Sequence, residues 1–155
     1  MNEAAFISLC QMHMPGLYRI SLAILRSHAD AQDAVQQGLM KAWTARASVR
    51  PGSERAWLTR IVINECRNIQ RQRARMVPVD VLPEPPYTPP DTALKEAIDA
   101  LPERWRLPLL LKYMEGMSEK EAARVLGISQ TALKGRLHRA RKALEKTLNE
   151  EVELG

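Results

Sequence analysis

The side chains with the clearest chemical potential in this sequence are basic and lie near its C-terminus. Residues 129–146 hold six Lys or Arg and one Glu. Such cations bind phosphate oxygens, and Arg, Lys, Gln and Thr also hydrogen-bond the edges of bases. The pattern predicts binding of a polyanion such as nucleic acid, with a solvated helix face as the alternative. The candidate contact residues are Gln130, Thr131, Lys134, Arg136, His138, Arg139 and Arg141.

To present these side chains together, residues 118–146 must form two helices joined by a tight turn. Ser118 and Glu121 have the spacing of a capping box. Gly127 supplies the turn, and Ser129 caps the second helix. A second helix that is apolar on one side and basic on the others is typical of a helix–turn–helix, although two packed helices with a charged solvated face would look similar. Its apolar line consists of Leu133, Leu137, Ala140 and Leu144.

A second basic segment, residues 46–75, holds eight Arg and two Glu. We predict a helix at residues 53–75 within it, and we assign Trp57 to its buried side rather than to a base-stacking surface. Side chains at steps of four share one face of such a helix. The wet face of any amphipathic helix would show the same pattern. The residues that follow this spacing are Arg60, Asn64 and Asn68.

Prolines divide the chain. Six of the ten lie within residues 78–90, and proline both lacks an amide donor and disfavours helix at the preceding residue. The net charge is +6, −4 and +3 in residues 1–77, 78–100 and 101–155. We therefore predict an all-α fold of two small helical domains, the second a helix–turn–helix, joined by a proline-rich linker. The first domain, linker and second domain are residues 1–76, 77–91 and 92–155.

Apolar periodicity predicts further helices before the helix–turn–helix. In the first domain Pro15 is expected to separate the first two helices, Asp30 to cap the third and Ser53 to cap the fourth. In the second domain Pro108 is expected to kink its helix or to shift its start. The predicted helices are residues 2–13, 16–27, 30–46, 53–75, 91–100 and 103–114. The apolar line of the third consists of Ala31, Ala34, Val35, Leu39, Ala42 and Trp43.

The sequence offers no catalytic constellation, metal-ligand set or phosphate loop, so we predict no enzyme activity, metal or cofactor. Cys10 and Cys66 are too few for a disulfide framework or a zinc site, which fits a reducing cytosol. No apolar run approaches the roughly 18 residues of a membrane span. The N-terminus has no basic residue of the kind that begins a secretory signal. We expect a cytoplasmic protein without membrane insertion.

The sequence resembles the sigma-70 family, and its short two-domain layout resembles the extracytoplasmic-function (ECF) group. The segments that resemble region 4 of the family are Leu101-Pro-Glu-Arg-Trp-Arg, Glu115-Gly-Met-Ser and the basic helix that follows Leu126-Gly-Ile. The segment that resembles region 2.2 is Asp30-Ala-Gln-Asp-Ala-Val-Gln-Gln, and the one that resembles regions 2.3 and 2.4 is Arg55-Ala-Trp-Leu-Thr-Arg-Ile. The resemblance covers nearly the whole chain in the order of the family.

This resemblance implies a transcription initiation factor that binds RNA polymerase core, through the β′ clamp helices and the β flap, and promoter DNA. It assigns the −35 element to the helix that follows Ser129, and core binding to Asp30, Asp33, Gln36 and Gln37. The family usually has Glu where this chain has Gln32 and Gln37, so two charges are missing. The resemblance assigns the melted −10 element to Arg60, Asn64, Arg67, Asn68 and Arg71. We predict that Arg67, Arg71, Arg73 and Arg75 contact phosphates.

Two other functions compete with this one. A sigma-like mimic would bind an anti-sigma factor without binding promoter DNA, and it would not need a basic second helix in the helix–turn–helix. An ordinary helix–turn–helix regulator would leave the first domain unexplained and would usually be a dimer on a palindrome. The resemblance also implies an anti-sigma factor as a partner of the leading candidate.

Overall fold

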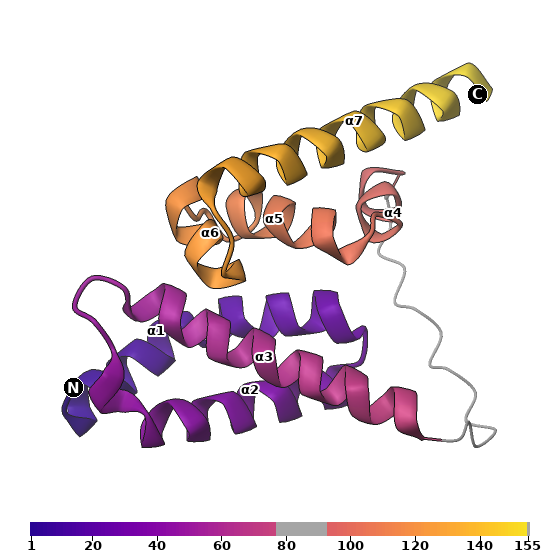
Figure 1. The fold of residues 1–155 in the computed structure, drawn as a ribbon. Helices are drawn as coiled ribbons and strands as arrows, with labels where there is room; N and C mark the ends of the chain where they lie inside the picture. The colour runs from indigo at the N-terminus through magenta and orange to yellow at the C-terminus, as the bar shows by residue number, and fades with distance from the viewer. Residues whose placement is uncertain (77–92, 155) are drawn as a thin grey trace. The chain divides into compact units, whose positions relative to one another are not determined.

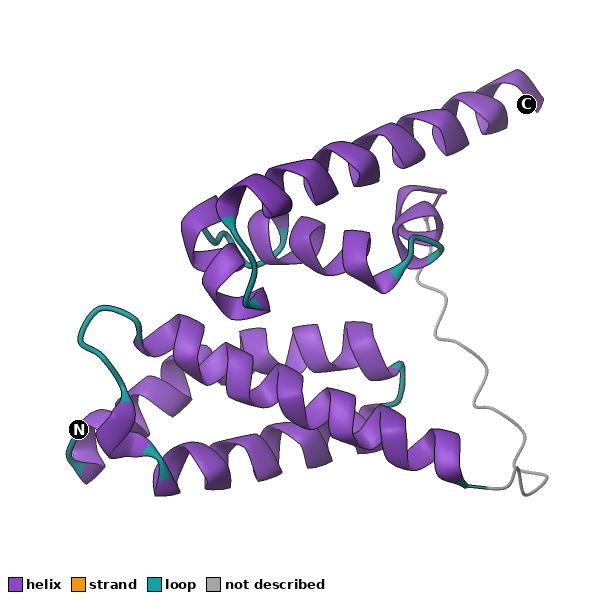
Figure 2. Ribbon diagram, viewed as in Figure 1, coloured by secondary structure: helices purple, strands orange, loops and turns teal. Residues whose placement is uncertain are grey.

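The computed structural model describes residues 1–76 and 93–154, and every regular element in these ranges is a helix (Figures 1 and 2). Its internal contacts divide the chain into two compact units. We call unit 1 the one that holds residues 1–76 and unit 2 the one that holds residues 93–154. The all-α class predicted from the sequence is confirmed. The predicted linker, residues 77–91, lies outside the described residues.

The described part of unit 1 is a helical bundle in which each long helix packs against the other two. Apolar residues that recur every three or four positions give each helix one apolar stripe, and the three stripes can be buried only against one another. The elements are α1 (Glu3–Leu25), α2 (His28–Thr44), the 3₁₀ turn η1 (Arg46–Ser48) and α3 (Glu54–Arg75). Their shared core holds Phe6, Cys10, Leu17, Val35, Ala42, Leu58 and Val62.

Helix α1 continues through Pro15, so the prediction of two helices at residues 2–13 and 16–27 is wrong. Proline removes one helical hydrogen bond and crowds the preceding turn. Tertiary packing outweighs this cost, because Phe6 and Cys10 before the proline and Leu17 after it belong to one core cluster. Large apolar side chains such as Phe6 and Leu17 each contribute about 1.5–3 kcal/mol when they are fully removed from water.

Helix α2 begins earlier than predicted, and Asp30 does not cap it. The N-cap is Ser27, whose Oγ accepts the Asp30 N–H at 3.3 Å. Asp30 therefore lies in the first helical turn, where a carboxylate favours the helix dipole. Helix α3 does have Ser53 at its N-cap position, but the serine side chain makes no cap hydrogen bond. Glu54 Oε1 instead accepts the Gly52 N–H at 3.0 Å.

Helices α2 and α3 approach each other closely at Gly38. A Cβ added to Gly38 would lie 2.7 Å from Val62 Cγ2 and 3.1 Å from Val62 Cα. The absence of a side chain at Gly38 is what permits this crossing. The two cysteines, Cys10 and Cys66, are both buried thiols, and burial raises the pKa of the Cys10 thiol.

The described part of unit 2 packs α4, α5 and α6 against the long helix α7. Helix α5 begins at Glu103, as predicted, and continues through the buried Pro108, so its start is not shifted. The elements are α4 (Ala93–Asp99), α5 (Glu103–Tyr113), α6 (Glu119–Leu126) and α7 (Gln130–Leu154). None of the helices that the structure describes has the length and hydropathy that a membrane span requires.

Arg106 joins α4 to α5 from the inside of unit 2. The residue is only 5% exposed, and its guanidinium donates to the carbonyl oxygens of Asp99 at 3.2 Å and Leu101 at 3.1 Å. A buried cation that binds carbonyls at a helix end satisfies acceptors that the helix leaves open. Arg106 is thus a structural residue of unit 2, although its charge alone gave no sign of this.

Candidate nucleic-acid interface

Helices α6 and α7 form the helix–turn–helix, and local hydrogen bonds define its turn. Ser118 Oγ accepts the Glu121 N–H at 3.1 Å, and Ser129 Oγ accepts the Ala132 N–H at 3.1 Å. Between the two caps, Gly127 has φ +68°, a left-handed conformation that glycine adopts without strain. Both serine caps and the turn glycine predicted from the sequence are therefore confirmed, and they set the direction in which α7 leaves the turn.

Helix α7 buries one side and exposes the other. Leu133, Leu137 and Ala140 are at most 1% exposed. Six of the predicted contact residues of α7 are exposed, and Arg136 is half-buried on the flank of the helix. Opposite the buried line, steps of seven and four place Thr131, His138 and Lys142 on the outward face. We give the name α7 surface to the exposed polar residues of the first half of this helix: Gln130, Thr131, Lys134, His138, Arg139, Arg141 and Lys142.

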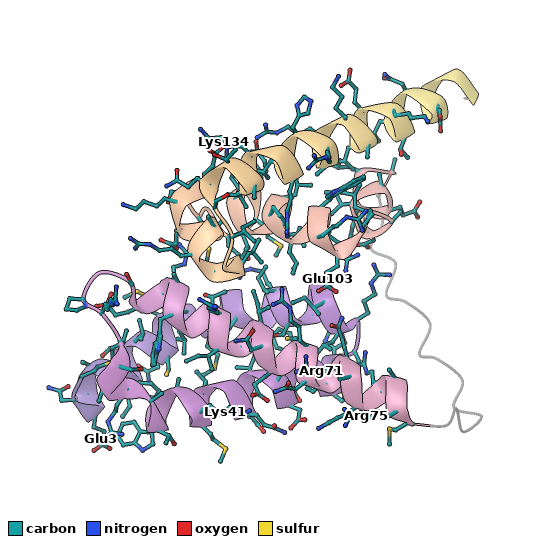
Figure 3. All side chains as sticks on the ribbon, in the orientation of Figure 1. Glu3, Lys41, Arg71, Arg75, Glu103 and Lys134 are labelled. Atoms are coloured by element: carbon teal, nitrogen blue, oxygen red, sulfur yellow. The ribbon has the colours of Figure 1, made fainter. Side chains whose placement is uncertain are left out.

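Glu119, in the first turn of α6, lies between two lysines. Lys112 Nζ lies 2.9 Å from Glu119 Oε1, and Lys134 Nζ lies 4.0 Å from Oε2. The hydrogen bond from Lys112 lowers the pKa of Glu119 below its ordinary value, against a smaller opposing effect of desolvation, and the charge of Lys134 lowers it further. The carboxylate therefore draws Lys134 (labelled in Figure 3) toward the α6 flank of the α7 surface.

Arg141 is held by a tyrosine of α5. Its guanidinium donates to the Tyr113 hydroxyl, and its Cζ lies 5.5 Å from the centroid of the tyrosine ring. Tyr113 is itself 59% exposed. The contact places a phenol and a guanidinium side by side at the edge of the α7 surface, where both can meet a phosphate. Sequence reasoning did not single out Tyr113, because nothing in its local pattern indicates a contact with α7.

Gly135 lies on the same helix, and little surrounds its Cα. Apart from the helix backbone and its chain neighbours, a Cβ added there would meet one atom within 4 Å, Nη1 of Arg139 one turn further along, at 3.3 Å. That atom is the tip of a flexible side chain and can move aside. No side chain therefore projects from the helix at Gly135. The packing of unit 2 does not require a glycine at this position.

The residues predicted to contact the −10 element share one face of α3. Arg60, Asn64 and Arg71 are exposed, and Arg67 and Asn68 are half-buried at the edge of that face. Trp57 packs against the core cluster, as predicted. We call the face that carries the five polar residues the α3 surface. The structure thus brings together all five predicted side chains on one helix.

A buried carboxylate lies beneath one end of the α3 surface. Glu65 is 3% exposed and forms an ion pair with Lys41 of α2. Glu65 Oε1 accepts the Asn68 side-chain amide at 3.4 Å, and Asn68 Oδ1 accepts a hydrogen bond from Arg71. These four side chains border a hollow of about 220 Å³ between α2 and α3, which Gln37 and Arg75 also line. Figure 3 shows Lys41 on α2 and Arg71 on α3.

The residues predicted to bind the polymerase core all lie on α2. They differ in the contacts that they already make with other side chains of unit 1. Asp30 is paired with Arg73 of α3, one of the arginines predicted to contact phosphates. Asp33 accepts two hydrogen bonds from the Gln37 amide, at 3.0 and 3.1 Å. Gln36 is exposed. The amide at Gln37 thus makes a contact that a glutamate facing Asp33 could not make at neutral pH.

An apolar hollow of about 550 Å³ lies along the C-terminal part of α2. Trp43 was predicted to belong to the buried line of α2, but it is 38% exposed, and Met40 beside it is 70% exposed. The Trp43 ring packs edge-on against Phe6 at a centroid distance of 5.3 Å, and the Arg46 guanidinium lies 3.6 Å from its centroid. The helical period that places Trp43 near the core does not bury so large a ring at the end of a helix.

Each unit matches a family model. Residues 9–76 match the model "Sigma-70 region 2", and residues 91–144 match "Sigma-70, region 4". The ECF RNA polymerase sigma factor SigM of Mycobacterium tuberculosis is 33% identical over 155 residues, which cover 95% of this chain and 79% of SigM. The ECF RNA polymerase sigma factor SigE of Mycolicibacterium smegmatis is 27% identical over 88% of this chain, and this chain spans 58% of the length of SigE.

A solved structure shows the same fold. The sigma factor RpoE from Bartonella quintana, in complex with the anti-sigma factor NepR, has a TM-score of 0.76 to this chain at 28% identity. The match covers 94% of this chain and 97% of that chain. Fold and site together define a two-unit helical protein with a helix–turn–helix. The chain belongs to the sigma-70 family and, within it, to the ECF RNA polymerase sigma factors.

Proposed function

We propose that this chain binds RNA polymerase core, directs it to promoter DNA and helps to open the −10 element, as an ECF-type initiation factor. The observation that carries the proposal is that each unit exposes one helix face rich in basic and amide side chains, the α3 surface and the α7 surface. One chain can then contact two promoter elements at once, while exposed residues of α2 bind the β′ clamp helices and unit 2 binds the β flap.

The two surfaces suit two different forms of DNA. The α7 surface follows a helix–turn–helix, whose second helix fits the major groove of a duplex. Its arginines and lysines can reach guanine edges and phosphates there. The α3 surface combines amides with arginines, which can hydrogen-bond and stack on the unpaired bases of a melted strand. The chain thus supplies −35 recognition in duplex DNA and −10 recognition in single-stranded DNA.

Polymerase core is a necessary part of this function. Each unit is small, so either surface alone buries little area on DNA. When the core holds both units at a set spacing, the second contact becomes intramolecular and its effective concentration rises. We therefore expect weak promoter binding by the free chain and specific binding by the chain with core.

Run-off transcription tests the proposal directly. Core RNA polymerase is incubated with a library of genomic fragments, with and without the full chain, and the transcript start points are mapped. We expect transcripts that depend on the chain and share −10 and −35 elements upstream of their starts. Absence of any chain-dependent transcript, with an ECF sigma factor of known promoter as the positive control, would reject the function.

A sigma-like mimic that binds an anti-sigma factor without DNA is the second candidate. The basic α7 surface argues against it, because binding a protein partner does not require Lys134, Arg139 and Lys142 to be exposed together. An anti-sigma factor is nevertheless a proposed partner of this chain, since the structurally similar RpoE is seen in complex with one. Copurification of a partner that lowers chain-dependent transcription would support that part of the proposal.

The proposal includes no catalysis and no cofactor. Binding energy from the two surfaces and from polymerase is sufficient to position and open DNA, and the chemistry of nucleotide addition belongs to the polymerase. The chain then acts in the cytoplasm, where bacterial RNA polymerase works.

A further inference from the structure

The buried carboxylate of Glu65 links α2 to the α3 surface through a continuous set of polar contacts. Its side chain is 4% exposed, and its partner Lys41 is 59% exposed at the rim of the groove between the two helices. From Glu65 the contacts continue to the Asn68 amide at 3.4 Å and from Asn68 Oδ1 to Arg71. Two of these four residues, Asn68 and Arg71, are predicted to contact the −10 element.

An ionised carboxylate only accepts hydrogen bonds, and this determines how Asn68 is oriented. The NH₂ group of Asn68 must face Glu65, so its carbonyl oxygen must face away. That oxygen is then available to accept from Arg71, whose guanidinium only donates. Each donating side chain in the set therefore has one accepting side chain, and reversing the Asn68 amide would break both of its contacts at once.

We propose that Glu65 is a positioning residue for −10 recognition, because it fixes the amide of Asn68 and through it the guanidinium of Arg71. The inference rests on the proposed function and deepens it. Arg71 has five N–H donors, and Asn68 Oδ1 engages part of this fork. The remaining donors are presented to DNA in one orientation, which favours a base edge that carries acceptors, such as guanine O6 and N7.

The substitution Glu65→Gln isolates this role. Glutamine has the shape of glutamate, and its carbonyl oxygen can still accept from Lys41. Its amide can also donate, so the Asn68 amide is no longer held in one orientation and Arg71 loses a fixed acceptor. We expect the preference for the best base at the affected −10 position to fall about fivefold to tenfold, which corresponds to the loss of roughly one hydrogen bond.

A second substitution keeps the acceptor-only chemistry at position 65. In Glu65→Asp the carboxylate is one methylene shorter but still cannot donate, so the Asn68 amide keeps its NH₂ group toward position 65. We expect the base preference to fall by no more than about twofold. A residue that merely stabilised the packing of α2 on α3 would lose more in Glu65→Asp, which removes buried volume, than in Glu65→Gln, which removes none.

The control is Ile63→Val, a mild core change in α3 at a side chain that is 1% exposed and outside the polar set. Ile→Val typically costs about 0.5–1.5 kcal/mol. It reports how base preference responds to a loss of stability alone. All assays are made with the full chain on core polymerase, well below the unfolding temperatures of the variants.

The measurement is open-complex formation, followed by a fluorescent base in the −10 element, on a promoter found by run-off transcription and on each of its single −10 substitutions. A loss for Glu65→Gln at one position, absent in Ile63→Val and in Glu65→Asp, supports the inference. Unchanged preference in Glu65→Gln, or an equal loss in Ile63→Val, overturns it while leaving the proposed function intact. A wild-type chain that opens no promoter overturns both.

Discussion

Arg73 of α3 and Asp30 of α2 form an ion pair, and the same guanidinium donates to the Leu25 carbonyl at 3.0 Å. The contacts tie the last turn of α3 to the start of α2 and the end of α1. The sequence assigned Asp30 to polymerase binding and Arg73 to phosphate binding. Because each group already has a partner in unit 1, we expect both to contribute less to binding than their exposed neighbours.

The substitution Arg73→Met tests this relationship. The side chains of the pair are 40% and 36% exposed, so a loss of about 0.5–1 kcal/mol in the stability of unit 1 is expected. The salt dependence of promoter binding by holoenzyme should change little. In the matched control Arg75→Met, at an exposed arginine also predicted to contact phosphate, the slope of log affinity against log salt should fall by about one phosphate contact. Equal slopes in the two variants would contradict the assignment.

Gly38→Ala should destabilise unit 1, because the new Cβ would lie 2.7 Å from Val62 Cγ2 and 3.1 Å from the Val62 backbone. Backbone cannot move aside as a side-chain tip can, so α2 and α3 must separate. We expect a loss of about 1–3 kcal/mol in the free energy of unfolding, measured by chemical denaturation. Val62→Ala removes the Cγ2 contact but leaves the backbone contact and costs stability by itself, so the double variant should lose less than the sum of the two single changes. Strictly additive losses would argue against this crossing as the cause.

Gly135→Ala, in contrast, should stabilise unit 2. The added Cβ meets only the tip of Arg139, at 3.3 Å, and alanine favours a helix interior over glycine by about 1 kcal/mol. Thermal unfolding should therefore occur at a higher temperature. Binding of holoenzyme to a −35 duplex should weaken, since the methyl group raises the α7 surface. A lower unfolding temperature would show that the glycine is needed for the fold.

The stability of unit 2 should depend on acid pH through Glu119. Because the hydrogen bond from Lys112 lowers the pKa of Glu119 in the folded state, the charged form is favoured by folding. Its contribution is present above the ordinary pKa near 4.5 and is lost as pH falls through the lower folded-state value. Thermal unfolding of wild type and Glu119→Gln should therefore differ at neutral pH and converge below that window. A difference that is constant with pH would exclude this carboxylate as the cause.

Arg139→Ala should reduce discrimination at the −35 element more than overall affinity. A guanidinium that reads a base edge contributes about 1–3 kcal/mol of discrimination, whereas a phosphate contact weakens binding to all sequences alike. Lys142→Ala, one turn away on the outward face, is the control for a phosphate contact. Holoenzyme affinity is measured on matched and mismatched −35 duplexes. An equal loss of affinity on both duplexes for Arg139→Ala would show that Arg139 does not contact a base edge.

The sequence alone determined the features that local spacing controls. Some features depend on near neighbours in the chain, so they could be predicted and were confirmed. They are the caps at Ser118 and Ser129, the turn glycine at Gly127 and the apolar line that includes Leu133 and Leu137. The grouping of arginines and amides on one face of α3 follows from the helical period for the same reason. The membership of the sigma-70 family also followed from motifs in their order.

Tertiary structure decided the features that depend on residues far apart in sequence. Pro15 lies inside one helix because core packing on both sides outweighs a lost hydrogen bond. The partners of Asp30, Glu65 and Arg141 come from other helices, and no local spacing predicts which charges will meet. Glu65 and Arg106 are buried and make contacts inside their units, whereas the exposed charges remain available to DNA and polymerase. Sequence shows where charge lies along the chain, whereas packing decides which charges are left to bind a partner.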